Sequence, residues 1–128
     1  MKYTLGKDEK LKSRKLIEHL FAEGKRVKSF PLQLIYLQIS HDSEFPVKVG
    51  FSVPKKVVKS AVDRNRIKRM MREAYRLNKY LNSENIKEHY IFMLIYTDKA
   101  EPKYTDLEEM FKKVCVKFLS KIEEDGQN

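Results

Sequence analysis

Cysteine is almost missing from this chain, since Cys115 is the only one among 128 residues. A single thiol excludes an internal disulfide and a zinc site built from several cysteines. Cys115 also falls on the apolar stripe of a segment with helical periodicity, where a free cysteine behaves as a small hydrophobic residue. We therefore assign Cys115 to the core.

Long apolar runs are missing as well. No run approaches the roughly 18 residues that a membrane-spanning helix requires, and residues 1–8 lack the apolar core of a secretory signal. The chain is therefore expected to be a cytoplasmic protein with no membrane partner.

Signatures of protein catalysis are absent too. His19, His41 and His89 fall on a predicted helix, a turn and the start of a strand, without the spacing of metal ligands. There is no glycine-rich phosphate loop, and no serine or cysteine stands in a nucleophile motif. The acids of the last helical segment occupy positions that look exposed, which disfavours a metal site made of two carboxylates. The sequence predicts neither a catalytic residue nor a metal ligand in the polypeptide.

Positive charge is abundant in one place. Between Lys55 and Lys79 there are ten Lys or Arg residues against two acids, a local excess of +8 in a chain of net charge +9. In the rest of the chain, positively and negatively charged residues are almost equal in number. Charge this local indicates a binding surface and not an aid to solubility.

The basic segment also has helical periodicity, at about 100° per residue. An apolar arc of about 120° holds Ile67, Met70, Met71, Ala74, Leu77 and Leu81. An adjacent arc of about 140° holds Arg64, Asn65, Lys68, Arg69, Arg72, Arg76 and Lys79. Arg66 and Glu73 lie apart from both, and Ser60 with Asp63 forms a capping box. One face is predicted to pack and the next to bind, because an ordinary exposed helix would mix both signs.

Three further segments precede this helix. Ser13 to Glu23 predicts a short helix with Ser13 as its N-cap and Gly24 as its stop. Leu32 to Ile39 and Val47 to Val53 predict two strands. Because the link between these strands is short and polar, we expect them to pair as an antiparallel hairpin.

The last third of the chain predicts a strand and a helix. Tyr90 to Tyr96 is apolar on both faces, as in the central strand of a sheet. Thr105 and Glu108 form a second capping box, after which helical spacing continues to Ile122. The tail 123–128 is expected to fray.

The order α-β-β-α-β-α, without repeats or linkers, predicts one α+β domain over residues 1–128, with an ordered core of about 10–122. A small central sheet would be packed by helices.

A second group of candidate binding residues surrounds the predicted strands. Gly50 and Ser52 leave a small-residue face beside Lys48, which a ligand backbone could approach closely. Lys55 and Lys56 follow directly. Three residues could form a stacking floor for unpaired bases, or could equally belong to the core: Ile17, Phe21 and Tyr36.

Two stretches then carry a specific resemblance. They are Phe51-Ser52-Val53-Pro54-Lys55-Lys56 and Ala61-Val62-Asp63-Arg64-Asn65-Arg66-Ile67-Lys68-Arg69, continued by Arg72-Glu73-Ala74-Tyr75. The chain resembles the bacterial ribonuclease P protein component, a family marked by an Arg-Asn-Arg motif after a Gly-x-Ser-Val-x-Lys-Lys strand. The resemblance extends from about Lys10 to Leu119.

The resemblance implies an accessory subunit of a ribozyme. In this family the RNA, with Mg²⁺ held mainly by that RNA, removes the 5′ leader of precursor tRNA. The protein, one per catalytic RNA, holds the single-stranded leader in a cleft between the first helix and the sheet. The residues implied for the catalytic RNA are Lys55, Lys56, Arg64, Arg66 and Arg69. Those implied for the leader are Phe21, Tyr36, Lys48, Ser52, Arg64, Asn65, Lys68 and Arg72. Ile17 stands where relatives often have Phe.

The resemblance also implies a fold like domain 2 of ribosomal protein S5, with a left-handed β-α-β crossover. The general rule for such crossovers would predict the opposite hand.

Two other classes of protein would share the basic helix. A structural RNA-binding protein would have it without needing a leader cleft, and cleavage assays with a catalytic RNA would separate the two. A helix-turn-helix DNA reader would need a partner helix just upstream, where this sequence has a strand and the turn Val53-Pro54-Lys55-Lys56.

Overall fold

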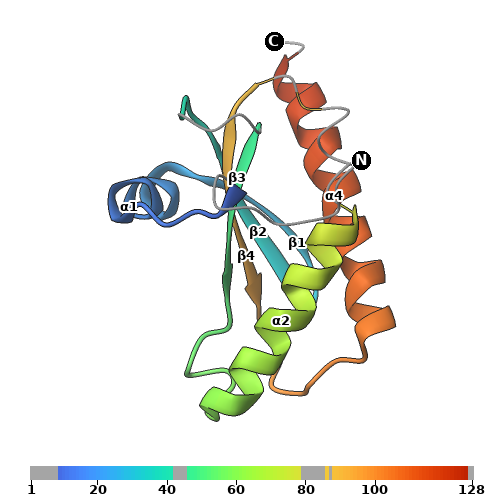
Figure 1. Ribbon diagram of the computed structural model, residues 1–128. Helices are drawn as coiled ribbons and strands as arrows, with labels where there is room; N and C mark the ends of the chain where they lie inside the picture. The colour runs from blue at the N-terminus through green and yellow to red at the C-terminus, as the bar shows by residue number, and fades with distance from the viewer. Residues whose placement is uncertain (1–8, 42–45, 79–85, 87, 127–128) are drawn as a thin grey trace.

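The computed structural model, which describes residues 9–41, 46–78, 86 and 88–126, is a four-stranded sheet with helices on both faces (Figure 1). The elements are α1 (Arg14–Glu23), β1 (Lys25–Ser29), β2 (Leu32–Gln38), β3 (Val47–Ser52), α2 (Ala61–Asn78), β4 (Tyr90–Tyr96) and α4 (Tyr104–Gly126). Helix α1 lies on one face, and α2 and α4 lie on the other. The α+β class is as expected from the sequence.

Helix α1 begins and ends where the sequence predicted. The Oγ of Ser13 accepts a hydrogen bond from the amide of Leu16 at 3.3 Å, so Ser13 is the N-cap. At the other end the amide of Gly24 donates to the carbonyl of Leu20 at 2.8 Å. A Cβ on Gly24 would lie 2.4 Å from that carbonyl oxygen and 2.7 Å from Cγ2 of Ile35. Glycine therefore lets the chain turn against the sheet and start β1 at once.

Strand β1 was not predicted, so the order is α-β-β-β-α-β-α and not α-β-β-α-β-α. Its sequence is Lys-Arg-Val-Lys-Ser, in which only Val27 is buried. A strand at the edge of a sheet commonly carries such charges, which discourage pairing with another chain. The lack of an apolar alternation hid this strand from sequence analysis.

The predicted hairpin of β2 with β3 is wrong. Strand β2 pairs antiparallel with β1 and with β4, and β3 pairs parallel with β4, which gives the order β1-β2-β4-β3. Strand β4 is buried along its whole length, and it gains neighbours on both edges by lying between β2 and β3. Its central position was predicted correctly.

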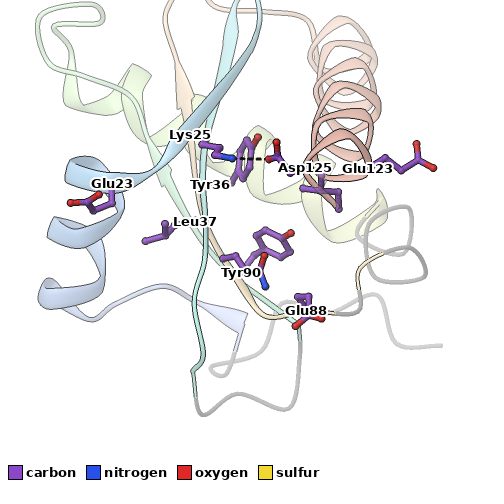
Figure 2. Close-up of a pocket in the computed structure, with 10 residues that line it drawn as sticks. Glu23, Lys25, Tyr36, Leu37, Glu88, Tyr90, Glu123 and Asp125 are labelled. Atoms are coloured by element: carbon purple, nitrogen blue, oxygen red, sulfur yellow. Dashed lines mark hydrogen bonds and ion pairs between the residues drawn. The ribbon is translucent and has the colours of Figure 1, made fainter. Parts of the chain in front are cut away.

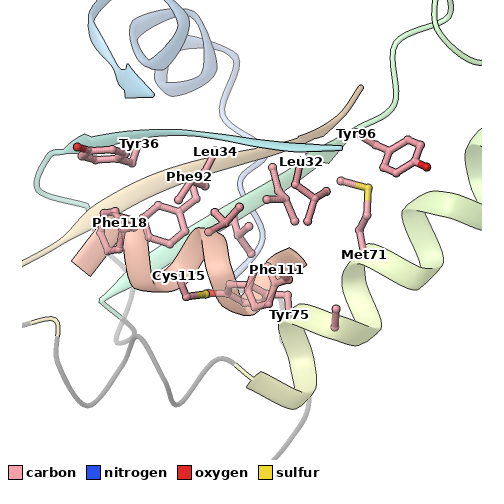
Figure 3. Packing of buried hydrophobic residues seen from close by; sticks show 14 of the residues in the cluster. Leu32, Leu34, Tyr36, Met71, Tyr75, Phe92, Tyr96, Phe111, Cys115 and Phe118 are labelled. Carbon is pink, nitrogen blue, oxygen red and sulfur yellow. The ribbon is translucent and has the colours of Figure 1, made fainter. Parts of the chain in front are cut away.

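The sheet separates two apolar clusters. Leu20 of α1 packs with Ile35, Ile91 and Met93 on one face. On the other face the strands pack against α2 and α4 in a larger cluster (Figure 3). There Phe118 contacts Phe92 edge to face, with ring centroids 4.8 Å apart, and Cys115 lies in the core as expected.

Helix α4 differs from the prediction at both ends. It starts at Tyr104, so Thr105 lies inside the helix and is not its cap. Glu108, the other member of the predicted capping box, accepts hydrogen bonds from Asn78 at 2.9 Å and from Tyr104 at 3.2 Å. The helix continues to Gly126, past the expected fray point, and Asp125 pairs with Lys25 at 2.7 Å.

Helix α2 connects the parallel strands β3 and β4 and completes the expected β-α-β unit. The handedness of this crossover stays a prediction from the resemblance. Strand β3 and a turn at 54–57 precede α2, so no helix stands where a helix-turn-helix motif would need one.

Candidate nucleic-acid interface

Helix α2 places the basic residues on the surface and its apolar stripe in the core. Ile67, Met71 and Ala74 are buried, as are Tyr75 and Asn78, while Met70 and Leu77 are half-buried. Leu81 and Lys79 lie outside the described residues. The predicted N-terminus is confirmed, since the amide of Asp63 donates to Oγ of Ser60 at 3.3 Å.

One row of cations, Arg64, Lys68 and Arg72, faces β3 and the turn that follows it. Arg64 Nη1 donates to the carbonyls of Val58 and Lys59 at 3.0 and 2.8 Å. Arg72 Cζ lies 5.9 Å from the ring centre of Phe51 on β3, within cation–π distance. These contacts orient the row beside the end of β3, with the charge of Arg72 exposed to solvent.

A second group faces the start of α4. Arg66 Nη1 lies 3.1 Å from a carboxylate oxygen of Glu101 and 3.6 Å from Asp63. Glu73 pairs with Arg76, and the hydrogen bond from that guanidinium holds the pKa of the Glu73 carboxyl below its ordinary value. The sequence separated Arg66 from the first row correctly.

Four cations of this surface are available to a ligand. Within the described part of the chain, neither a hydrogen bond nor an ion pair engages Lys55, Lys56, Lys68 or Arg69. Lys55 and Lys56 are exposed in the turn at 54–57, where the amides of Val57 and Val58 both donate to Pro54 O at 3.0 Å. Asn65 is also exposed on α2. Of the four available cations, Lys55, Lys56 and Arg69 were predicted to contact the catalytic RNA, and Lys68 was predicted to contact the leader.

The face of the sheet that carries α1 holds three of the predicted leader residues. Lys48 and Ser52 are half-buried on β3, on the same side as Gly50. Phe21 is 45% exposed on α1. Ile17 packs against the cluster around Leu20, in agreement with its alternative assignment to the core.

Tyr36 is the exception, and its expected place beside Phe21 is wrong. It is 3% exposed and points to the opposite face, where its ring meets Phe118 edge to face at 4.9 Å. Adjacent residues of a strand point to opposite faces, so Ile35 and Leu37 face α1 instead. Tyr36 therefore cannot stack a base on the face that carries α1.

Sequence analysis missed two residues that shape the basic surface. Phe51 positions the Arg72 guanidinium. The sequence could have indicated this role, because Phe51 follows Gly50 in a strand of alternating residues. Glu101 neutralises Arg66 from a loop 35 residues away in sequence, and no local pattern marks such a contact.

His41 and His89 stack with ring centres 4.5 Å apart, although their sequence positions appeared scattered. Burial lowers the pKa of His41. Over the part of the chain that is described, no group of three or more His, Cys, Asp or Glu side chains could hold a metal ion. The same residues include no helix long and apolar enough to cross a membrane.

Fold and surface together define a small α+β protein in which one cationic helix face continues into a lysine-rich turn at the sheet edge. A family model described as Ribonuclease P matches residues 5–119. A Ribonuclease P protein component from Porphyromonas gingivalis is 32% identical over 124 residues, or 94% of this chain and 90% of that protein. Another from Chlorobaculum tepidum is 46% identical over 79 residues, or 59% of this chain and 51% of that protein.

Solved structures show the same fold. The RNase P protein from Thermotoga maritima superposes with a TM-score of 0.68 at 22% identity, covering 84% of this chain and 94% of that one. The RNase P protein of Staphylococcus aureus gives 0.64 at 22% identity, covering 83% and 91%. The chain belongs to the ribonuclease P protein family.

Proposed function

We propose that this protein is the accessory subunit of a ribonuclease P holoenzyme. It binds the catalytic RNA, one protein per RNA, and holds the single-stranded 5′ leader of precursor tRNA. The observation that carries this proposal is the set of cations without an intramolecular partner, Lys55, Lys56, Lys68 and Arg69, in a chain that belongs to the family. Such a surface tracks phosphates without reading sequence.

The two rows on α2 suit two different RNA contacts. Arg64, Lys68 and Arg72 continue toward β3, where Ser52 and Lys48 lie, so they suit an extended leader crossing the sheet edge. Arg66 points toward the start of α4, away from this row, and suits the catalytic RNA. Arg69 and the turn lysines Lys55 and Lys56 are assigned to the same RNA by the family resemblance. Phe21 supplies an exposed ring on the α1 face for base stacking.

The chemical step is assigned to the RNA. Hydrolysis of the phosphodiester requires Mg²⁺, which in this proposal is held mainly by the RNA. The protein's own residues supply positive charge and orientation, which bring the leader to the ribozyme and reduce the Mg²⁺ needed to neutralise phosphates.

Reconstitution with a bacterial ribonuclease P RNA and a precursor tRNA at low Mg²⁺ tests the proposal. We expect the protein to stimulate cleavage over RNA alone, and to do so less when Lys68 and Arg69 are both changed to alanine. Lys112→Ala with Lys113→Ala removes the same charge from the exposed side of α4 and serves as the matched control. An absence of stimulation, or equal losses in the two double variants, would overturn it.

A further inference from the structure

A pocket of about 520 Å³ lies at the end of the sheet, between the strands and the end of α4, and its lining extends to Glu23 at the end of α1 (Figure 2). It is separate from the cationic surface of α2. Tyr36 of β2 and Tyr90 of β4 stand next to each other in it, with ring centres 6.4 Å apart. The buried ring of Phe118 contacts both tyrosine rings edge to face, with ring centres 4.9 and 5.4 Å apart.

The two tyrosines present polar atoms that the fold leaves unused. Tyr36 is 3% exposed and Tyr90 is 6% exposed. No residue in the described ranges forms a hydrogen bond with either hydroxyl. Burial raises the pKa of both phenols, so both stay neutral at physiological pH. Both tyrosines line the pocket, so each hydroxyl can accept a hydrogen bond from a ligand N–H there.

The charge of the pocket is opposite to that of the rest of the molecule. Its lining contains four acids and one lysine, a local charge of −3 in a chain of net charge +9. Only Asp125 among the four has an ion pair among the described residues. Glu23 and Glu123 turn away from the rings (Figure 2). They therefore contribute to the negative electrostatic potential of the pocket without contacting a ligand beside the rings. The pocket therefore repels phosphate and attracts cations.

The chain already places one ammonium group here. Lys25 Nζ lies 2.7 Å from Asp125, and this hydrogen bond raises the pKa of Lys25. In the view of Figure 2, Lys25 and Asp125 lie on either side of the Tyr36 ring. A carboxylate and aromatic faces are the usual surroundings of a bound organic cation.

We propose that this pocket binds a small organic cation carrying primary ammonium groups, such as a polyamine. A second pocket of about 410 Å³ shares Gln38 and Glu88 with the first, which leaves room for an elongated ligand. One ammonium contacts the tyrosines and competes with Lys25 for Asp125. The next lies toward Glu88. The neutral phenols and the single carboxylate beside them, that of Asp125, suit an ammonium better than a divalent metal, which prefers several anionic oxygens.

Titration of the full chain with spermidine tests this, with the ring signals of Tyr36 and Tyr90 followed by NMR. We expect saturable shifts at both rings. Glu88→Gln and Tyr90→Phe should each weaken binding several-fold, and Lys25→Ala should strengthen it about threefold because Asp125 is released. Arg26→Ala, on the same strand but outside the pocket, is the matched control and should change the affinity much less.

Three outcomes would overturn the proposal. The shifts could fail to saturate, Lys25→Ala and Arg26→Ala could change the affinity equally, or MgCl₂ could shift the same signals at lower concentration. A lysine-containing tetrapeptide distinguishes the sources of the ammonium group. If it saturates these signals while spermidine does not, the ligand is a protein side chain and not a free polyamine. All these measurements omit RNA, so they are independent of the proposed function.

Discussion

At some positions of this chain the residue type is determined by the space that neighbouring atoms leave, and not by charge. Gly24 has φ −69° and ψ 152°, a conformation open to any residue. Its lack of a side chain is needed because Leu20 and Ile35 occupy the position of a Cβ. The close approach of α1 to the sheet depends on this one position.

Gly24→Ala should therefore destabilise the protein by about 1–3 kcal/mol, the usual cost of overpacking. Gly50→Ala is the matched control. Its Cβ would meet the end of the Met93 side chain, with Cε at 2.9 Å, and a flexible methionine can move. Denaturant unfolding of both variants checks this, and similar losses would show that the backbone at Gly24 has room to adjust.

The ionisation of Tyr96 is expected to make the stability of the fold depend on pH in the alkaline range. Burial, with Asp98 and Glu101 nearby, raises its pKa to about 12, and its hydroxyl donates to the carbonyl of Ala100 at 2.5 Å. Because the folded-state pKa is raised, this contribution is full below the unfolded pKa of about 10 and is lost as the pH rises through the folded value.

We expect the free energy of unfolding to fall between about pH 10 and 12, and to fall less steeply in Tyr96→Phe. At neutral pH the same variant should lose about 1 kcal/mol, the value of one hydrogen bond. Unfolding curves over this pH range give both quantities. A parallel fall in the two proteins would mean that other groups, such as Tyr104, govern the alkaline limb.

At the scale of elements, α2 separates two sets of cations by the directions of its side chains. Lys68 lies in the row that faces β3, while Arg66 is directed to Glu101. We expect Lys68→Ala to weaken leader binding and to reduce the slope of log affinity against log salt by about 0.7. Arg66→Ala should weaken assembly with the catalytic RNA more than leader binding.

Gel-shift titrations with leader RNA and with the catalytic RNA, each at several salt concentrations, measure these effects. The loss for Lys68→Ala should be nearly independent of leader sequence, because a phosphate contact carries no base information. A strong dependence on sequence would place Lys68 on a base edge. Equal losses in both assays for Arg66→Ala would mean that the two directions of α2 contact one RNA surface.

The positions of the helices could be predicted from the sequence, whereas the pairing of the strands could not. Periodicity and caps located α1 and α2, because those signals are local to each helix. Strand pairing is not local. The short polar link between β2 and β3 suited a hairpin, and nothing in it indicated that β4 lies between these two strands. The β1 strand, with one buried residue, had no apolar signal. Missing β1 and the true pairing also left Tyr36 on the wrong face, since its direction depends on strand register.

Over the whole molecule, charge is divided between two surfaces. The cations of α2 and the 54–57 turn lie around the end of β3, while the acidic tyrosine pocket lies beside the end of α4. A polyanion approaching this molecule is attracted to one surface and repelled from the other. In the proposed function, this division orients the protein on RNA before any specific contact forms.

A contribution of the protein to the chemical step would require a general base or a metal ligand close to the cations of α2. Glu73 is the only acid in α2 besides Asp63, which makes it the best protein-borne candidate for a base or metal ligand near the cations. Its carboxylate is 46% exposed and already paired with Arg76. Such a surface pair contributes only a few tenths of a kcal/mol.

Glu73→Gln should therefore leave single-turnover cleavage by the saturated holoenzyme within about threefold, whereas loss of a general base typically costs about 10²-fold or more. Glu109→Gln, an exposed acid on α4, controls for the change in net charge. Leader affinity and assembly are measured in parallel, because a loss in either would mimic a loss of rate below saturation. A drop of about 10²-fold confined to the chemical step of Glu73→Gln would mean that the protein shares the catalysis assigned to the RNA.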